Sequence, residues 1–314
     1  MSATNPRILP YGTAAIEEAA RLIAEGGCVA VPTETVYGLA ADATESRAVA
    51  GIYQAKGRPS FNPLIVHVTD IAAAERLAEF SEISRDLALR FWPGPLTLVL
   101  PVRADAGLSA LVTAGLDTVA IRVPRHRAMQ ALLVAAGRPL AAPSANASGS
   151  ISPTRAEHVA KSLSGRIPLV IDDGPTPAGL ESTIVREHEI LRPGPLTAET
   201  LFPDEDRPVH LPEAKRPGEI IAPGQLESHY APASPVRLDA VQARGGEWLI
   251  GFGEIAGDDT LSATGDLIEA AARLFDALHR ADASGAPSIA VAPIPRQGIG
   301  IAINDRLRRA ASPR

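Results

Sequence analysis

The chain has 314 residues, enough for two domains, and its 46% hydrophobic and 21% charged residues are ordinary for a globular protein. Its formal net charge of −6 disfavours a non-specific nucleic-acid binder, which would normally be basic. The single Cys28 excludes an internal disulfide and a cysteine-based zinc site, and no apolar stretch is long enough to cross a membrane. We therefore expect a cytoplasmic protein that neither enters a membrane nor holds nucleic acid stably.

The first 200 residues alternate helical and strand-like segments. Apolar periodicity with caps and flanking glycines predicts helices over 14–25, 46–55, 71–90 (interrupted near 80–81), 126–136 and 152–161. Short apolar runs predict strands over 28–31, 64–68, 96–100, 118–123, 140–142, 169–171, 182–186 and 189–191. Ser152 and Pro153 are typical of an N-cap followed by proline at the first helical position. Some strands follow helical crossovers while the last two share a short turn, so we predict an α/β domain over 1–202 with a twisted mixed sheet and flanking helices.

Residues 203–234 are rich in proline and charge and poor in periodic apolar positions, which is typical of a linker. Beyond it the sequence predicts strands over 236–238, 248–252 and 288–292 and helices over 266–280 and 299–310. This order predicts a smaller C-terminal Rossmann-like α/β domain over 235–314. The run 251–256 formally fits Gly-x-Gly-x-x-Ala, but Gly-Asp-Asp-Thr follows it where a helix should start, which disfavours a dinucleotide site.

The segment Lys-Gly-Arg-Pro-Ser-Phe-Asn-Pro at 56–63 has the composition of a polyanion cradle on backbone stiffened by two prolines. Of the 30 Lys and Arg residues only Lys56, Lys161 and Lys215 are lysine. Lysine offers a compact point charge and arginine a planar fork, so the two are not interchangeable at an anion site. The alternative is that Lys56 merely ends a helix and favours its C-terminal dipole. As an anion-site lysine it is expected to be exposed and to contribute little to packing.

Polar side chains also gather at the ends of predicted strands. Ser144 and Asn146 follow a short apolar strand, where an α/β sheet exposes its loops, although they could equally cap a turn. Ser182 and Thr183 begin a strand shortly after Gly179, and an ordinary turn and strand would explain them as well. Each pair by itself leaves a structural and a functional interpretation open.

Two arginines lie within or at the end of apolar strands, Arg122 in Val-Ala-Ile-Arg-Val-Pro and Arg192 in Leu-Arg-Pro-Gly-Pro. A buried arginine needs an anionic partner, so a ligand carboxylate or phosphate competes with an internal Asp or Glu. The sequence contains neither a P-loop motif nor a His-Glu-x-x-His motif, which disfavours those nucleotide and zinc sites.

Four motifs occur together in the order seen in the YrdC-type threonylcarbamoyl-AMP synthases, and the chain resembles that family over about residues 10–200. They are Pro32-Thr-Glu-Thr-Val-Tyr-Gly-Leu, Lys56-x-Arg-x-x-x-Asn-Pro, Pro143-Ser-Ala-Asn and Ser182-Thr-Ile. The segment 223–232, Pro-Gly-Gln-Leu-Glu-Ser-His-Tyr-Ala-Pro, is similar to the signature that joins the catalytic domain to the extra domain in the longer, two-domain form of the family.

The resemblance implies a nucleotidyltransferase that condenses L-threonine, bicarbonate and ATP into threonylcarbamoyl-AMP and pyrophosphate for tRNA t6A37 biosynthesis. It implies Mg²⁺ accompanying the ATP and hand-off of the product to a tRNA threonylcarbamoyl transferase. No residue is assigned as a metal ligand, and the sequence leaves open whether protein side chains ligate Mg²⁺. The alternative is a YrdC-like RNA-binding factor without synthase activity. A carbamoyl-transfer enzyme of hydrogenase maturation shares the fold but needs cysteine-rich zinc sites.

The resemblance also assigns roles to residues. We expect Lys56 and Arg58 to clamp the triphosphate and the reacting carboxylate, with Asn62 and Ser144 on phosphate or ribose. Threonine would be held by Thr35, His67, Arg122 and Ser182, with Arg122 on its carboxylate. Nucleotide contacts are expected from Arg58, Asn62, Thr118, Ser144, Ser152, Arg192 and Tyr230, the last as part of a lid. Glu34 is expected to be a structural carboxylate beside a buried donor, and His67 could instead be a satisfied histidine at a strand edge.

Overall fold

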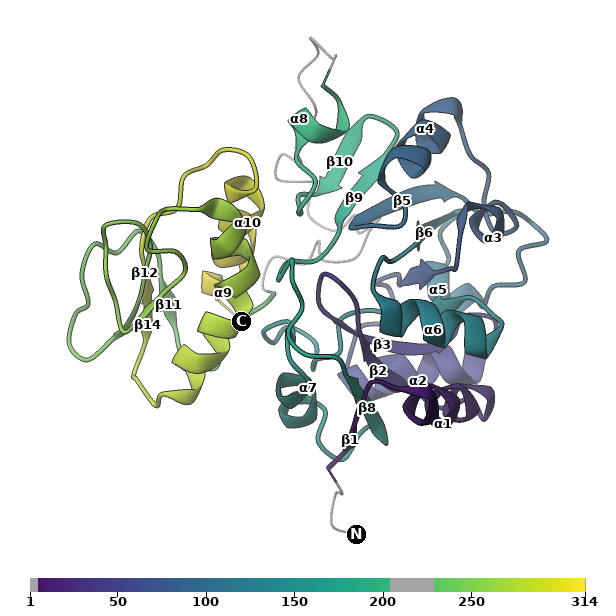
Figure 1. The fold of residues 1–314 in the computed structure, drawn as a ribbon, viewed down its shortest axis with the longest axis horizontal. Coiled ribbons are helices and arrows are strands. Elements are labelled where there is room, and N and C mark those ends of the chain that lie inside the picture. Colours follow the sequence, from purple (N-terminus) through teal and green to yellow (C-terminus); the bar gives the residue numbers. More distant parts are fainter. Residues whose placement is uncertain (1–4, 204–228, 314) are drawn as a thin grey trace.

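The computed structural model describes residues 5–203 and 229–313. Figure 1 shows a large N-terminal α/β domain beside a smaller C-terminal one. The large domain is built on a ten-stranded sheet. In spatial order its strands are β1 (Arg7–Pro10), β8 (Leu169–Asp172), β2 (Val29–Pro32), β3 (Tyr37–Asp42), β7 (Leu140–Ala141), β4 (Ile65–His67), β6 (Thr118–Arg122), β5 (Leu96–Pro101), β9 (Thr183–Arg186) and β10 (Glu189–Arg192).

The sheet combines parallel and antiparallel neighbours, which confirms the predicted mixed sheet. β4 pairs with β6 in parallel and β5 pairs with β9 in parallel, while β5 and β6 run antiparallel. β1 and β3 were not predicted. β3 is buried along its whole length, and its sequence Tyr-Gly-Leu-Ala-Ala-Asp contains no β-branched residue, so it lacks both the alternation and the composition by which strands are recognised.

Helices cover both faces of this sheet, as predicted. They are α1 (Thr13–Ala24), α2 (Ser46–Lys56), α3 (Ile71–Glu75), α4 (Glu82–Phe91), α5 (Ala110–Thr113), α6 (Arg127–Ala136), α7 (Ala156–Ser162) and α8 (Ala198–Leu201). Val29 and Val31 of β2 pack with α1 and α6, whereas Ala30 packs with α2 on the other face. The expected interruption of the helix over 71–90 is confirmed, since Ser81 caps a separate helix, α4.

The predicted start of the helix at Ser152 is wrong. Helix α7 begins at Ala156, with Arg155 at its N-cap position. The Ser152 hydroxyl donates instead to Glu181 at 2.5 Å, and the Ser152 carbonyl lies 3.1 Å from His279 Nε2. Tertiary partners from two distant segments therefore outweigh the local capping pattern.

The smaller domain has a four-stranded parallel sheet in the order β11 (Val236–Arg237), β14 (Ile289–Val291), β12 (Trp248–Gly251) and β13 (Asp259–Thr260). Helices α9 (Leu267–Ala283) and α10 (Gly300–Ala311) lie between this sheet and the large domain (Figure 1). Asp266 caps α9 by accepting from two backbone N–H groups of its first turn. The predicted Rossmann-like α/β arrangement is confirmed, and strand β13, not helix, follows Gly251 after a turn.

The two domains share an apolar and polar boundary. Val36, Ile151, Leu180 and Tyr230 pack into the hydrophobic core of the smaller domain. Gly179 has φ +67°, and a Cβ there would lie 2.5 Å or less from backbone atoms of α9, so the close approach requires glycine. We propose the division into 1–202, 203–234 and 235–314, although 204–228 lie outside the described residues.

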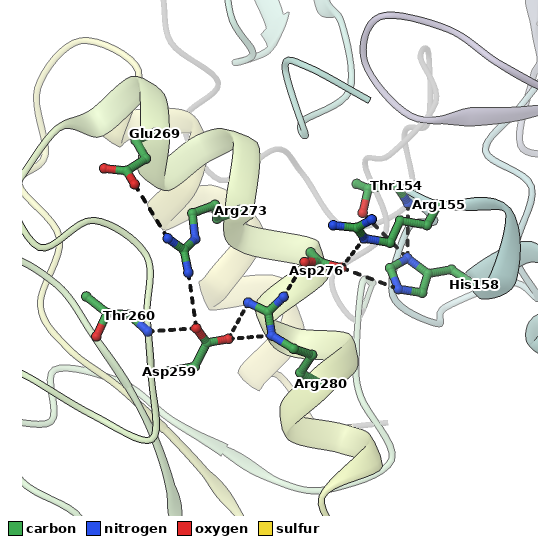
Figure 2. A network of polar contacts seen from close by, with 9 residues as sticks. All are labelled: Thr154, Arg155, His158, Asp259, Thr260, Glu269, Arg273, Asp276 and Arg280. Atoms are coloured by element: carbon green, nitrogen blue, oxygen red, sulfur yellow. Dashed lines mark hydrogen bonds and ion pairs between the residues drawn. The ribbon is translucent and has the colours of Figure 1, made fainter. Parts of the chain in front are cut away.

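A polar network crosses the same boundary (Figure 2). Arg155, at the start of α7, donates to Asp276 of α9 at 2.9 Å, and Arg280 joins Asp276 to Asp259 of β13. His158 stacks on His279 with ring centroids 3.7 Å apart. The boundary is therefore joined by specific ion pairs and a ring stack as well as by apolar packing.

Candidate active site

A narrow cavity of about 50 Å³ opens at the edge of the large sheet where β4 and β6 end. Because these strands are parallel, their last residues meet at one edge, the usual place for a ligand in an α/β sheet. Eight of the residues expected in the site line this cavity: Thr35, Arg58, His67, Arg122, Ser144, Ser182, Arg192 and Tyr230. Residues far apart in sequence are thus gathered around one space.

Four other expected residues are not part of the lining. Lys56 and Asn62 each bind a lining residue directly, and Ser152 donates to Glu181, which is itself in the lining. Thr118 lies four residues before Arg122 in β6 and pairs with Pro101, roughly 13 Å along the strand. The expected contact of Thr118 with the nucleotide stays a prediction, and its distance from the cavity does not favour it.

Lys56 is buried, so the expectation of an exposed lysine is wrong. It ends α2, and Gly57 follows as a left-handed C-cap. Its Nζ donates to the carbonyls of Ser144 and Asn146, both at 2.5 Å. Burial and the nearby Arg58 hold the pKa of Lys56 well below its usual value. Within residues 5–203 and 229–313 no carboxylate hydrogen-bonds this ammonium group, so an incoming anion would supply the missing countercharge.

Arg58 is fixed by its own loop. Its Nε and Nη2 donate to the Asn62 carbonyl and side chain and to the Pro63 carbonyl, at 2.6–3.2 Å. The turn made by the two prolines thus holds the guanidinium plane against the cavity. Burial lowers the pKa of Arg58 to about 10, so it stays protonated at neutral pH. Asn62 serves here as the residue that orients Arg58.

Arg122 has an internal anionic partner, which resolves the question left open by the sequence. Its Nη2 lies 2.7 Å from a Glu34 oxygen, and its Nη1 donates to the Thr35 hydroxyl at 2.9 Å. Burial alone would raise the pKa of Glu34, but the ion pair with Arg122 and the hydrogen bond from the Arg125 backbone outweigh it and keep that pKa below its usual value. The expected structural role of Glu34 agrees with this geometry.

His67 is a buried neutral imidazole beside Arg122. Burial, followed by repulsion from Arg122, lowers its pKa from 6.5 to about 3. Its Nδ1 is buried and has no hydrogen-bond partner among the described residues, so the structure does not favour the alternative of a fully satisfied histidine. The ring offers a neutral polar atom in the cavity, suited to a ligand hydroxyl or amine.

The titration of His67 should be visible in the stability of the protein. Its folded-state pKa of about 3 lies below the unfolded value of 6.5, so between them the unfolded chain takes up a proton that the folded chain does not. His67 therefore contributes stability that is present above 6.5 and is lost as the pH falls towards 3. We expect the free energy of urea unfolding to drop more steeply from about pH 7 to about pH 5 in the wild type than in His67→Asn. Equal slopes would contradict this assignment.

Arg192 and Ser182 form the opposite wall. Arg192 donates to the Ser182 carbonyl and hydroxyl at 2.9–3.2 Å, and the Ser182 hydroxyl lies 2.7 Å from the Thr97 hydroxyl. Glu181, next to Ser182, also lines the cavity and was not expected from the sequence. The position of this carboxylate directly before the Ser-Thr-Ile motif could have pointed to a role in the site. Its partner, Arg306, lies 125 residues away, so the sequence did not reveal the pair.

Tyr230 and His229 close one side of the cavity from the end of the expected linker. Tyr230 is buried and its hydroxyl has no hydrogen-bond partner in the described part of the chain. His229 packs edge-on against it, with ring centroids 4.0 Å apart. Burial and the nearby Arg58 and Lys56 hold the pKa of His229 well below its usual value, so it is neutral here.

The comparisons with known proteins agree with this arrangement over nearly the whole chain. The Sua5_yciO_yrdC family, described as "Telomere recombination", matches residues 21–194, and the domain described as "Threonylcarbamoyl-AMP synthase, C-terminal domain" matches residues 197–312. Threonylcarbamoyl-AMP synthase of Bacillus subtilis is 43% identical over 95% of this chain and 93% of its own length. The chain belongs to the threonylcarbamoyl-AMP synthase family.

Other members of the threonylcarbamoyl-AMP synthase family give the same picture. The enzyme of Pyrococcus abyssi is 41% identical over 94% of each chain. The crystal structure of P. abyssi Sua5 complexed with L-threonine has a TM-score of 0.88 and 38% identity, and the match covers 98% of each chain. Since the match spans both domains, the longer two-domain form predicted from the sequence is confirmed.

Proposed function

We propose that this chain is a threonylcarbamoyl-AMP synthase that condenses L-threonine, bicarbonate and ATP and releases pyrophosphate. The observation that carries the proposal is 43% identity to a synthase over nearly the full length of both chains. The gathering of the motif residues around one cavity supports it. The threonine amine and bicarbonate first form a carbamate, a step in which the new N–C bond replaces a C–O bond and water leaves. A carbamate oxygen then forms a bond to the α-phosphorus, and the bond from that phosphorus to the pyrophosphate oxygen breaks.

The threonine half of the site would lie at the ends of β4 and β6. The similar P. abyssi Sua5 was crystallised as a complex with L-threonine, which supports threonine as the substrate here. We assign the threonine carboxylate to Arg122, whose guanidinium is held in place by Glu34, Thr35 and the Gly94 carbonyl. His67 and Ser182 would contact the remaining polar groups of threonine. A pre-positioned arginine fixes the reacting amine without losing side-chain freedom on binding.

The nucleotide half would be formed by Lys56, Arg58, Ser144, Arg192 and Tyr230. The reaction brings a carbamate and a triphosphate together, so the site must neutralise negative charge at fixed positions. Lys56 and Arg58 are buried cations that form no ion pair with a carboxylate among the described residues, which suits this task. We propose contacts to phosphate or ribose for Ser144, and a lid role for Tyr230.

Mg²⁺ would enter with ATP and not through a protein-built site. The described residues contain no group of three or more His, Cys, Asp or Glu side chains that could hold a metal. The carboxylates at the cavity, Glu34 and Glu181, are each paired with an arginine. We infer that the ion would be held by the phosphates and water, as is common for Mg²⁺ at nucleotide sites.

An RNA-binding factor without synthase activity is the competing function. The full-length identity to synthases and the complete set of motif residues favour the enzyme. We propose that its product passes to a tRNA threonylcarbamoyl transferase without stable nucleic-acid binding by this chain, and that it works in the cytoplasm. Among the described residues no helix is both long and apolar enough to cross a membrane.

Pyrophosphate release tests the proposed function. With ATP, Mg²⁺ and bicarbonate present, release should depend on added L-threonine and be at least about tenfold slower with L-alanine, which lacks the hydroxyl and methyl groups. Release that ignores threonine would contradict the proposal. Tight RNA binding in the same preparation would then favour the competing function.

A further inference from the structure

The C-terminal domain places one arginine directly behind the wall of the active site. Arg306 of α10 is 0% exposed and heads the largest fully buried side chains among the residues that the structure describes. Its Nε donates to Glu181 at 2.9 Å and its Nη2 to the Pro193 carbonyl at 2.9 Å. Its Nη1 donates to Asp305 at 2.8 Å. The guanidinium therefore joins two segments of the large domain to α10.

Both segments support residues that we expect to bind the nucleotide. Glu181 lines the cavity, and its second oxygen accepts from Ser152. Pro193 directly follows Arg192, so the bond to its carbonyl fixes the backbone that presents Arg192. The guanidinium carbon of Arg306 also lies 5.2 Å from the centre of the Tyr230 ring. One side chain of the smaller domain thus contacts the supports of three expected nucleotide-binding residues.

Stability alone does not account for the buried ion pair between Arg306 and Glu181. A buried ion pair contributes little net stability compared with apolar side chains of similar size, because both charges must leave water. What it supplies is geometry, since a guanidinium fork binds its partners in one plane only. Arg308, on the same helix, differs from Arg306 in both respects. Its side chain is 73% exposed, and its ion pair within the described residues is with Asp305 of the same helix.

We propose that Arg306 is a positioning residue of the active site, through which the C-terminal domain fixes Glu181, Tyr230 and the Arg192 segment for nucleotide binding. The inference rests on the proposed function. It gives the C-terminal domain a defined part in the reaction beyond carrying the end of the linker. Arg122 and His67, which hold most of the threonine half, lie on other strands and should not depend on Arg306. Ser182 follows Glu181 and accepts from Arg192, so only this contact to threonine should be affected.

The first test is Arg306→Met, which removes the fork but keeps much of the volume. We expect the KM for ATP to rise about 10- to 100-fold, as for the loss of a charge-assisted hydrogen bond. The KM for threonine should rise by a clearly smaller factor, because Arg122 and His67 keep their places and only Ser182 adjoins the disturbed segment. Arg308→Met, on the same helix, is the matched control and should leave both values within about twofold. An unchanged KM for ATP in Arg306→Met, or equal rises for both substrates, would overturn the inference.

The pH profile gives a second readout. The charged or titratable groups that interact with Glu181 are Arg306, Arg192, Tyr230 and Lys56. Burial alone would raise the pKa of Glu181, but Arg306, Arg192 and the Ser152 hydrogen bond outweigh it, so the pKa lies below its usual value. Without Arg306 burial should dominate and raise that pKa. The variant should therefore lose activity on the acid side at a higher pH than the wild type, and an unchanged profile would count against the inference.

Two more variants keep the test decisive if Arg306→Met does not fold. Glu181→Gln/Arg306→Met removes the buried carboxylate that Arg306→Met alone would leave without its arginine. It should fold and retain the raised KM for ATP, and it should lose the acid-side shift in activity, because no carboxyl group remains at 181. Arg306→Lys should recover part of the ATP affinity. A double variant with wild-type KM for ATP would overturn the inference. Wild-type protein that releases no pyrophosphate with threonine would contradict the proposed function instead. Thermal unfolding of the variants does not depend on that function, and it would show separately whether each variant is folded.

Discussion

Lys56→Met is expected to lower kcat/KM for threonine-dependent pyrophosphate release by at least about 100-fold, the usual effect of removing one preorganised group that stabilises developing charge. Lys56 is a buried ammonium group whose described hydrogen-bond acceptors are oxygens of Ser144 and Asn146. No carboxylate among the described residues hydrogen-bonds it, so an anionic ligand would favour its protonated form. A triphosphate and a carbamate together would complete that environment. Initial rates with both substrates varied will measure the effect.

Lys56→Arg is the matched control, because it keeps the charge and changes the shape. The two carbonyls that bind Lys56 converge on a single nitrogen, a geometry that a planar fork cannot reproduce. We expect this variant to stay well below wild-type turnover. An undiminished rate would show that charge alone is sufficient and would contradict the proposed need for a compact ammonium group.

Arg122→Met should both abolish threonine use and destabilise the fold. It leaves Glu34 buried without its partner, and breaking a buried ion pair in this way lowers the free energy of unfolding by about 3–5 kcal/mol. Chemical denaturation measures the stability, and threonine titration of pyrophosphate release measures the affinity. Loss of activity without loss of stability would show that Glu34 does not depend on Arg122 in the folded protein.

The double variant Glu34→Gln/Arg122→Met separates the two effects. It removes the unpaired carboxylate, so most of the stability should return, while threonine binding should stay lost because the carboxylate partner is still missing. Recovery of threonine-dependent turnover in the double variant would show that Arg122 does not bind the substrate.

The sequence predicted those parts of the fold that have a local signal. Helix periodicity located α9, and the capping residues around Ser81 located the break before α4. The strand β3 was missed because it has neither the alternation of a half-exposed strand nor the β-branched residues that marked the buried strand β2. The start of α7 was misplaced because Ser152 binds Glu181 and His279, and such long-range partners leave no trace in a short window of sequence.

The same division holds for the site. The family resemblance placed His67 and Arg122 together, and the structure gives the reason, because β4 and β6 are parallel neighbours whose ends meet at one edge. The burial of Lys56 could not be foreseen, since it depends on carbonyls of the loop around Ser144. The pairing of Glu181 with Arg306 joins two domains, and only the docking of α10 on the large domain reveals it.

Mass spectrometry of the adenylate formed from ¹³C-labelled bicarbonate, ATP and L-threonine would decide whether this chain is a synthase. We expect threonylcarbamoyl-AMP that carries one labelled carbon, formed in step with pyrophosphate. An unlabelled threonyl adenylate, or no adenylate at all, would contradict the proposed reaction.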